Sequence, residues 1–246
     1  EPTGEGGLKD FASAQVMVAY FQVFLTTMRR EWHKIDHLRM DKFMMMTRKF
    51  FQQTVVILEK TGWDEERVAL FAESIGDRVL DKDDPHAGLG FALHVADIYL
   101  EALVGAKEPL PAGTVDLLLE PWYGLLEAPV NKALMLRVET TVWGALADHV
   151  KEGTSAFSQM DVSQVVGRLV ETAGEETTPS ANRAVLHSAS KAIRRAEHAR
   201  ERAAAGGDGE GGSSARKRAK MAAARAQIEA AAGAEGAGGV VGPGEG

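Results

Sequence analysis

Apolar residues recur at helical spacing along most of the chain. The clearest case is residues 86–104, where leucines and alanines three, four or seven positions apart share one helical face. No run of alternating β-branched residues is typical of a strand. The pattern predicts an all-α fold, and we expect antiparallel helix pairs stacked as an irregular HEAT-like helical bundle. Because no strict internal repeat is present, the stacking is a prediction about packing rather than a detected period.

Gly, Pro and acidic residues divide this pattern into separate helices. The expected helices are residues 11–32, 35–60, 64–80, 86–104, 115–119 (interrupted by Pro121), 130–150, 161–172 and 179–205. Gly62 is expected to end the second helix, and Asp161 with Gln164 to cap the seventh. The first helix is so rich in apolar residues that we expect it to be buried on more than one side.

Composition changes along the chain and suggests four regions. Residues 1–10 are predicted to be a flexible, acidic and Gly-rich lead, 11–173 a helical scaffold domain, and 174–205 a polar, basic helix. Residues 206–246 are low-complexity, first basic and then Gly/Ala-rich. From Ala203 to Gly246 there are 12 Gly, 14 Ala and no aromatic residue, which cannot bury enough surface to offset chain entropy. We expect this tail to be disordered apart from a helix over 215–232.

The absence of cysteine excludes disulfides, thiolate metal sites and cysteine nucleophiles. The chain begins with Glu1 and shows no signal peptide, and no window approaches the roughly 20 apolar residues that cross a bilayer. We therefore expect a segment of a longer, soluble protein without membrane partners. The net charge is −7: residues 1–150 hold 15 Lys/Arg and 23 Asp/Glu (net −8), and residues 151–246 hold 13 and 12 (net +1). The global charge argues weakly against a nucleic-acid binder.

One stretch departs from this acidic background. Residues 29–49 contain seven Lys/Arg and three Asp/Glu, net +4, mixed with large apolar side chains. These charges either form ion pairs within a helix, each worth about 0.2–0.5 kcal/mol, or make a basic ridge that contacts phosphate or an acidic partner. The candidate partner- or RNA-binding residues are Arg29, Arg30, Trp32, Lys34, Asp36, Arg39, Asp41, Lys42, Arg48 and Lys49.

Two groups of polar residues at helical spacing raise the question of catalysis. His33, His37 and Asp41 are spaced i, i+4, i+8 along an expected helix face, but Lys34 stands where a zinc peptidase needs Glu, so we predict no metal site. His94, Asp97 and Glu101 resemble an acid/base set. We expect instead a polar rim in which His94 pairs with Asp97, and we predict no catalytic residue, no cofactor and no small-molecule substrate.

A second basic run lies in the tail. Arg216, Lys217, Arg218 and Lys220 follow one another without an acid among them. Such clusters in flexible segments act as nuclear import signals or nucleic-acid patches, although a merely solvated charge run is the alternative. We predict a nuclear-localisation signal here.

Several spaced motifs together resemble the ribosomal RNA processing protein 1 family. They are Trp32, Ile35, Asp36, Leu38, Arg39, Asp41, Lys42, Phe43, Met44, Arg48 and Phe50, then Trp63, residues 88–103, and Leu119, Pro121 and Trp122, within roughly 11–150. His37 departs from the basic residue more usual there, and the family's aromatic-rich amino-terminal motif is missing.

The resemblance implies a non-enzymatic helical scaffold in nucleolar precursors of the large ribosomal subunit. Its expected role is maturation of the precursor to 5.8S and large-subunit rRNA, with pre-rRNA and other assembly factors as partners and the nucleus and nucleolus as location. The alternative is a helical protein–protein adaptor with no direct RNA contact, which the net charge of −8 over residues 1–150 favours.

Overall fold

The computed structural model describes residues 6–80 and 88–205, with the backbone alone for residues 6–15 and Met17. The helices are α1 (Gly6–Glu31), η1 (Trp32–Lys34), α2 (His37–Lys60), α3 (Glu65–Arg78), α4 (Leu89–Val104), α5 (Ala112–Leu126), α6 (Lys132–Val138), η2 (Glu139–Gly144), α7 (Ala145–Glu152), η3 (Ser155–Phe157), α8 (Val162–Gly174) and α9 (Ser180–Ala204). Over these two ranges there is no strand, which confirms the all-α prediction. Residues 206–246 of the predicted tail, with its basic run, lie outside the described residues.

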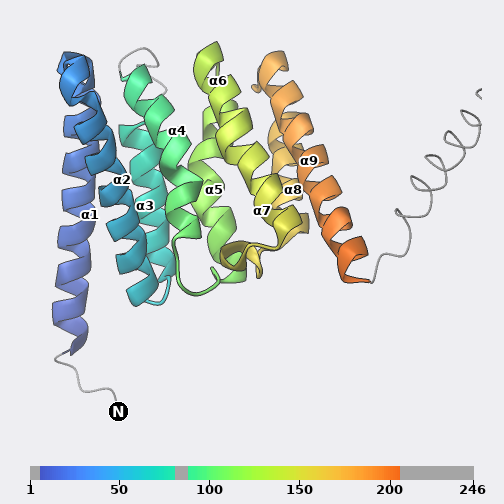
Figure 1. Cartoon of the computed structure of the whole chain (residues 1–246), viewed down its shortest axis with the longest axis horizontal. Coiled ribbons are helices and arrows are strands. Elements are labelled where there is room, and N and C mark those ends of the chain that lie inside the picture. Colours follow the sequence, from blue (N-terminus) through green and yellow to red (C-terminus); the bar gives the residue numbers. More distant parts are fainter. Residues whose placement is uncertain (1–5, 81–87, 206–246) are drawn as a thin grey trace, which may run out of the picture. The chain divides into compact units, whose positions relative to one another are not determined.

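The helices pack in two rows. In one row α1 contacts α3, α3 contacts α5, and α5 contacts α8; in the other α2 contacts α4, and α4 contacts α6 and η2 (Figure 1). Successive helices therefore form antiparallel pairs that stack side by side, as the helical periodicity predicted. The chain divides into two units, residues 1–200 and 201–246, and this description concerns the first.

Aromatic side chains form a continuous core through four helices. The ring of Phe71 on α3 lies 5.0 Å from Phe21 on α1 and 6.3 Å from Tyr99 on α4, and Tyr99 lies 5.2 Å from Trp122 on α5. All four side chains are buried, and each stabilises the fold by roughly 1.5–3 kcal/mol relative to exposure. The Tyr99 hydroxyl donates to the Leu118 carbonyl at 2.6 Å, and burial raises the pKa of Tyr99 well above its usual range.

Local sequence signals set the α2–α3 turn. Gly62 has φ +72°, the left-handed conformation that glycine adopts without a Cβ penalty, and it follows the end of α2 as predicted. The Trp63 N–H donates to the Leu58 carbonyl at 3.0 Å. Asp64 then caps α3 by accepting the Arg67 N–H at 3.2 Å. These contacts satisfy backbone groups that would otherwise be unpaired at both helix ends.

Pro121 does not interrupt its helix, contrary to the sequence prediction. α5 runs from Ala112 to Leu126 with Pro121 inside it. Proline removes the hydrogen bond to the carbonyl of Leu117, but its ring is buried against α3. A Cβ on Gly76 of α3 would lie 4.0 Å from the Cβ of Pro121, an ordinary van der Waals contact, so the proline packs against α3 at this position. Tertiary packing therefore outweighs the local cost.

The compact unit extends beyond residue 173, where the sequence placed its end. Helix α9 buries Val185, Leu186 and Ile193 in the common core. The side-chain amide of Asn182 donates to the carbonyls of Leu126 at 2.9 Å and Ala128 at 2.7 Å, which satisfies the carboxyl end of α5. The unit runs to residue 200. At the other end, α1 begins at Gly6, inside the stretch 1–10 expected to be a flexible lead.

A polar network fixes α8 against α5. Asp161 caps α8 by accepting the Gln164 N–H at 3.0 Å, as predicted. The Gln164 side chain instead donates to Asp116, at 3.2 Å. Asp116 also accepts from the Tyr123 hydroxyl at 3.2 Å, and Arg168 pairs with Glu120 at 2.8 Å. Buried Asp116 thus shares its oxygens between two helices.

Candidate interaction surface

The basic stretch 29–49 is two helices joined by a bend. α1 ends at Glu31, residues 32–34 form a 3₁₀ turn, and Ile35 is extended with φ −77° and ψ 122°. Asp36 is the N-cap of α2: its carboxylate accepts the Arg39 N–H at 3.1 Å and pairs with the Arg39 guanidinium at 2.6 Å. This hydrogen bonding lowers the pKa of Asp36. Asp36 therefore holds the start of the helix.

The bend also changes the geometry expected for a metal site. His33 lies in the 3₁₀ turn and His37 begins α2, so His33, His37 and Asp41 do not share one helix face. Within residues 6–80 and 88–205, no group of three or more His, Asp or Glu side chains is placed to hold a metal ion. Asp41 is exposed and makes no ion pair with another described residue.

Trp32 is a core residue rather than a surface contact, which corrects its place among the candidates. Its side chain is buried, and its ring lies 5.1 Å from Phe91 and 5.5 Å from His94. A Cβ at Gly90 would lie 3.1 Å from the indole, so this glycine leaves room for the tryptophan. Trp32 fixes the end of α1 against α4.

Several candidate cations are engaged with neighbouring carboxylates. Arg30 and Lys34 lie 2.6 and 3.0 Å from Glu31, and hydrogen bonds from Arg30 and Lys34 lower the pKa of Glu31. Arg48 reaches across to Glu101 on α4 at 3.1 Å. Local ion pairing, as the sequence indicated, therefore accounts for Arg30, Lys34 and Arg39, whose partners lie within three residues. Arg48 instead pairs between two helices. Arg29 is half-buried, and its aliphatic stem lies where a Cβ at Gly88 would be.

Lys42 and Lys49 differ from these paired cations. Both are exposed, and neither makes an ion pair with any residue that the structure describes. They stand seven positions apart on α2 and so share one helix face. Arg48 points to the other side, toward α4. The exposed side chains of Leu38 and Met45 share this part of the surface. We call the outward side of α1, η1 and α2 the α1–α2 surface; its exposed cations are Arg30, Lys34, Arg39, Lys42 and Lys49.

Sequence reasoning missed part of this surface. The apolar residues of the first helix were expected to be buried on more than one side, but Val16, Tyr20 and Val23 are exposed. Their spacing of four and three residues was visible in the sequence as a second apolar face. Only the packing of α1 against α3 shows which of the two faces is buried.

A model of the nucleolar protein Nop52 family matches residues 8–219 of the chain. The chain belongs to the Nop52 family. This confirms the resemblance stated from the motifs, and the nucleolar location expected from them is that of the family.

Ribosomal RNA processing protein 1 homologs are among the relatives of this Nop52-family chain. Human homolog B is 31% identical over 131 residues, which cover 52% of this chain and 17% of the relative. Human homolog A is 34% identical over 100 residues, covering 40% and 22%. The Drosophila melanogaster homolog is 29% identical over 126 residues, covering 51% and 18%. The chain therefore spans about a fifth of the length of these relatives.

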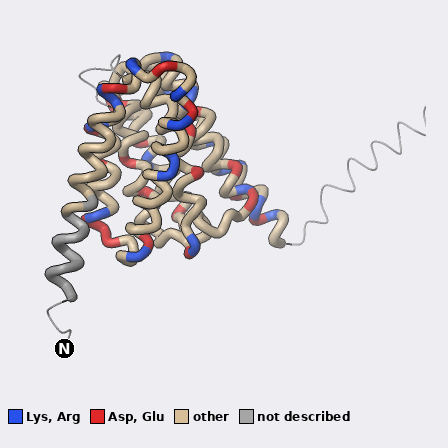
Figure 2. The backbone as a smooth tube through the Cα atoms, turned by 60° about the vertical axis from the view of Figure 1, so that its left-hand side comes forward, with Lys and Arg blue, Asp and Glu red and all other residues tan. Residues whose placement is uncertain are grey.

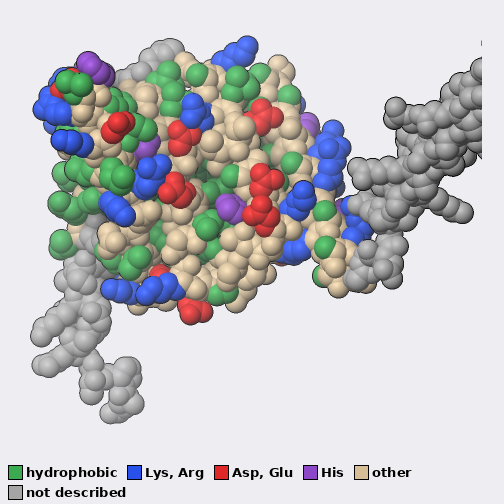
Figure 3. Space-filling model, viewed as in Figure 1, with side chains coloured by type: hydrophobic (Ala, Val, Ile, Leu, Met, Phe, Trp, Pro, Cys, Tyr) green, Lys and Arg blue, Asp and Glu red, His purple; other side chains and the backbone are tan. Residues whose placement is uncertain are grey.

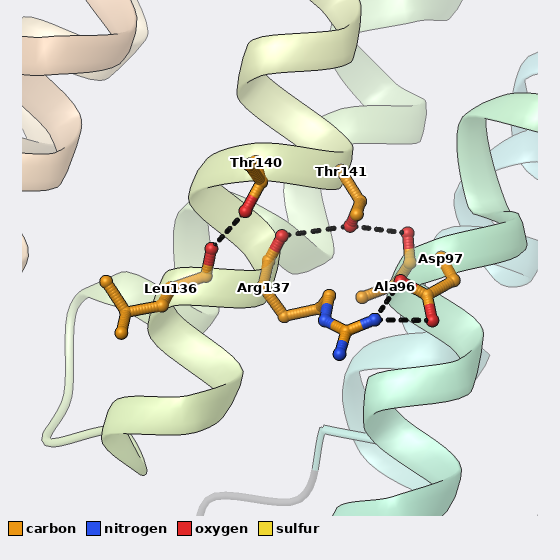
Figure 4. A network of polar contacts seen from close by, with 6 residues as sticks. All are labelled: Ala96, Asp97, Leu136, Arg137, Thr140 and Thr141. Atoms are coloured by element: carbon orange, nitrogen blue, oxygen red, sulfur yellow. Dashed lines mark hydrogen bonds and ion pairs between the residues drawn. The ribbon is translucent and has the colours of Figure 1, made fainter.

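The acid/base set considered in this Nop52-family chain does not assemble, and neither does the predicted polar rim. His94 is buried, and its Nε2 lies 3.1 Å from the Met44 carbonyl. Asp97 instead pairs with Arg137 on α6, whose Nη1 lies 2.9 and 2.8 Å from the two carboxylate oxygens (Figure 4). Glu101 pairs with Arg48. The three side chains therefore have three separate partners, and each joins α4 to another helix.

Next to that ion pair, η2 is a π-helical turn. Thr141 at this turn has its hydroxyl 3.0 Å from the Ala96 carbonyl on α4 and 2.9 Å from the Arg137 carbonyl, and Thr140 donates to the Leu136 carbonyl (Figure 4). Hydroxyl groups thus satisfy carbonyls where the helical register changes. The Thr141–Ala96 hydrogen bond joins η2 to α4.

A second surface feature of the Nop52-family chain is a groove of about 880 Å³ between α3 and α5. Its floor includes Ala72, Gly76 and Pro121, and its rim carries acidic residues such as Glu73 and Asp77. Charges of both signs are otherwise interspersed along the helices (Figure 2). None of the helices over the described ranges combines the length and the apolar character that crossing a bilayer requires.

Proposed function

We propose that this chain is a non-enzymatic helical scaffold in the assembly of the large ribosomal subunit, acting in pre-rRNA processing in the nucleolus. Its family and the names of its relatives connect it with the nucleolus and with rRNA processing. Its partners are other large-subunit assembly factors, and pre-rRNA is contacted directly or through them. We also propose that the chain acts in the maturation of the precursor to 5.8S and large-subunit rRNA, the role that the family resemblance implies.

The observation that carries the scaffold proposal is the α1–α2 surface. It combines exposed cations with exposed apolar side chains such as Tyr20 and Met45 on neighbouring helices. Large apolar side chains gathered on a surface are typical of protein–protein contacts. The polar groups considered for catalysis, His94, Asp97 and Glu101, are instead committed to joining helices.

A second candidate function is a protein–protein adaptor without direct RNA contact. Arg39 and Arg48, two residues expected to contact phosphate, pair with carboxylates of the chain itself. Lys42 and Lys49 stand beside apolar side chains, which phosphate does not require. These observations favour docking of the chain on other proteins, which in turn would bind the pre-rRNA. The acidic rim of the α3–α5 groove fits basic proteins, which are abundant in ribosome precursors.

Purification of the tagged full chain from nuclear extract, with and without nuclease, tests both candidates. Large-subunit assembly factors that remain bound after nuclease support the scaffold and favour protein docking. Recovery that nuclease abolishes, and that weakens steeply with salt, supports direct RNA contact instead. Recovery of neither assembly factors nor pre-rRNA would contradict the proposed function.

A further inference from the structure

Helix α1 has an apolar stripe that nothing in the described structure covers. Val16, Tyr20 and Val23 are 68%, 66% and 63% exposed, and their spacing of four and three residues places them on one side of the helix. Phe21 and Leu25, on another side, are buried in the core. The exposed stripe is therefore additional to the face that holds α1 in the fold.

Helix α2 continues this stripe with a regular spacing. Phe43, Met46, Phe50 and Ile57 are separated by three, four and seven residues, which follows the heptad positions that pack one helix against another. Met46 is 42% exposed and Ile57 36%. Towards the core side of the same helix lie Phe51 and Leu58, which are buried. The stripe thus lies at the edge of the buried face and reaches the surface.

An aromatic cluster joins the two stripes. Phe50 stacks on Phe24 with a ring separation of 3.9 Å and lies 5.5 Å from Tyr20. We define the apolar end face as Val16, Tyr20, Val23, Met46, Phe50 and Ile57. Figure 3 shows hydrophobic side chains gathered over this edge of the helical rows, where α1 and α2 lie side by side. Two adjacent helices with heptad-spaced apolar residues form a seat for a third helix.

The other end of the rows does not share this character. The exposed residues of α9 include Lys191, Arg194 and Arg195, and no large hydrophobic side chain of α9 is exposed within its described residues. The outward side of α9 is therefore polar, unlike the apolar end face.

The charges around the apolar end face indicate what covers it. Lys42 and Lys49 stand four positions before and three positions after Met46, so both lie along the same side of the stripe on α2. Residues 29–49 have a net charge of +4. A second copy of the chain would bring this positive charge against itself, which costs free energy. A helix with acidic side chains along the edge that faces this side would pair with both lysines.

We propose that the apolar end face binds an amphipathic helix of a partner protein, with apolar residues over Tyr20 and Met46 and acidic residues facing Lys42 and Lys49. This inference does not depend on the ribosomal role, because it follows from exposure, spacing and charge alone. The occupant is recognised by apolar residues at positions i, i+3 or i+4, and i+7, with Asp or Glu beside them.

Site-specific photo-crosslinking of the full chain in cells tests this proposal. The photoreactive residue benzoylphenylalanine replaces Tyr20, and in a matched control it replaces His187, an exposed residue on α9. We expect position 20, and not 187, to crosslink to a peptide of another protein with the apolar and acidic pattern described. The Lys42→Glu/Lys49→Glu variant should lose most of that crosslink while the circular dichroism spectrum is unchanged.

Four results would overturn the proposal. They are a crosslink to a second copy of this chain or to another segment of the same polypeptide, a crosslink to RNA, a crosslinked segment without the apolar and acidic pattern, and no crosslink above that of position 187. Because the proposed function is tested by nuclease-treated purification, its failure and the failure of this inference are separate observations.

Discussion

The imidazole of His94 donates its Nε2 proton to the carbonyl oxygen of Met44, 3.1 Å away on the neighbouring helix. A carbonyl only accepts, so the proton is on Nε2, and buried Nδ1 is unprotonated without a hydrogen-bond partner in the described structure. The ring stacks on Trp32 at 5.5 Å. One neutral histidine therefore joins the end of α1, the middle of α2 and the start of α4.

The stability of the fold should depend on the protonation of His94. Burial, the largest cause, lowers its pKa; the Met44 hydrogen bond, Asp97 and Glu101 act in the opposite direction, and Arg48 lowers it further. Since the unfolded chain binds the proton more readily, the stabilisation is present above about pH 6.5 and falls as pH drops below it, by at most about 1.4 kcal/mol per pH unit. Urea denaturation at about pH 7.5 and about pH 5.5 measures this loss.

Replacing the histidine isolates its contribution. The His94→Gln variant should show a shallower loss of stability over this pH interval than the parent chain, because it has no group to protonate there. His37→Gln, at an exposed position, is the control and should leave the pH dependence unchanged. Equal pH dependence in His94→Gln and the parent chain would contradict the assignment.

Trp32 should contribute to stability rather than to recognition. Trp32→Ala removes a buried ring between Phe91 and His94 and should lower the free energy of unfolding by about 3–5 kcal/mol. Trp32→Phe keeps part of the packing, so it should cost less and should retain partner recovery in the nuclear-extract experiment. Chemical denaturation measures the first effect. An unchanged denaturation midpoint in Trp32→Ala would show that the ring is not part of the core.

Asn182 should anchor α9 to the rest of the unit. In Asn182→Ala, the carbonyls of Leu126 and Ala128 lose their donor in a buried site, which should cost about 1–3 kcal/mol. Hydrogen exchange should rise first in α9. Ser188→Ala, an exposed substitution in the same helix, should have little effect on either measurement. If both variants behave alike, α9 is not held by this side chain.

The Arg137–Asp97 ion pair should contribute less than its short distances suggest. Its side chains are 45% and 31% exposed, so solvent screens the attraction and a double-mutant cycle with Arg137→Ala and Asp97→Ala should give a coupling free energy below about 1 kcal/mol. A coupling of several kcal/mol would indicate that the pair, rather than the packing around η2, holds α4 to α6.

Helix stops and caps could be predicted from the sequence, but contacts between helices could not. The stop at Gly62 and the cap at Asp161 depend on residues within one turn, and both predictions were confirmed. Pro121 was expected to break its helix because its packing against α3 is not a local property. The core-facing side of α9 was missed because its apolar residues, such as Leu186 and Ile193, are few in a mostly polar helix and share their face with polar residues such as Asn182.

Some features of the α1–α2 surface could likewise be predicted from the sequence, and others could not. The excess of positive charge over 29–49 was visible in the sequence, as were the ion pairs between neighbours such as Glu31 and Lys34. The pairing of Arg48 with Glu101, the burial of Trp32 and the exposure of Tyr20 depend on where α2 and α4 meet in space. Which residues reach the surface therefore required the structure.

The measurement that tests the central claim most directly compares partner recovery by the full chain and by its Lys42→Glu/Lys49→Glu variant. The matched control is Lys151→Glu/Lys191→Glu, which reverses two exposed lysines on α7 and α9. If the α1–α2 surface docks the chain in large-subunit precursors, the first variant should lose assembly factors and pre-rRNA, and the control should retain them. Equal recovery with both folded variants would contradict the account.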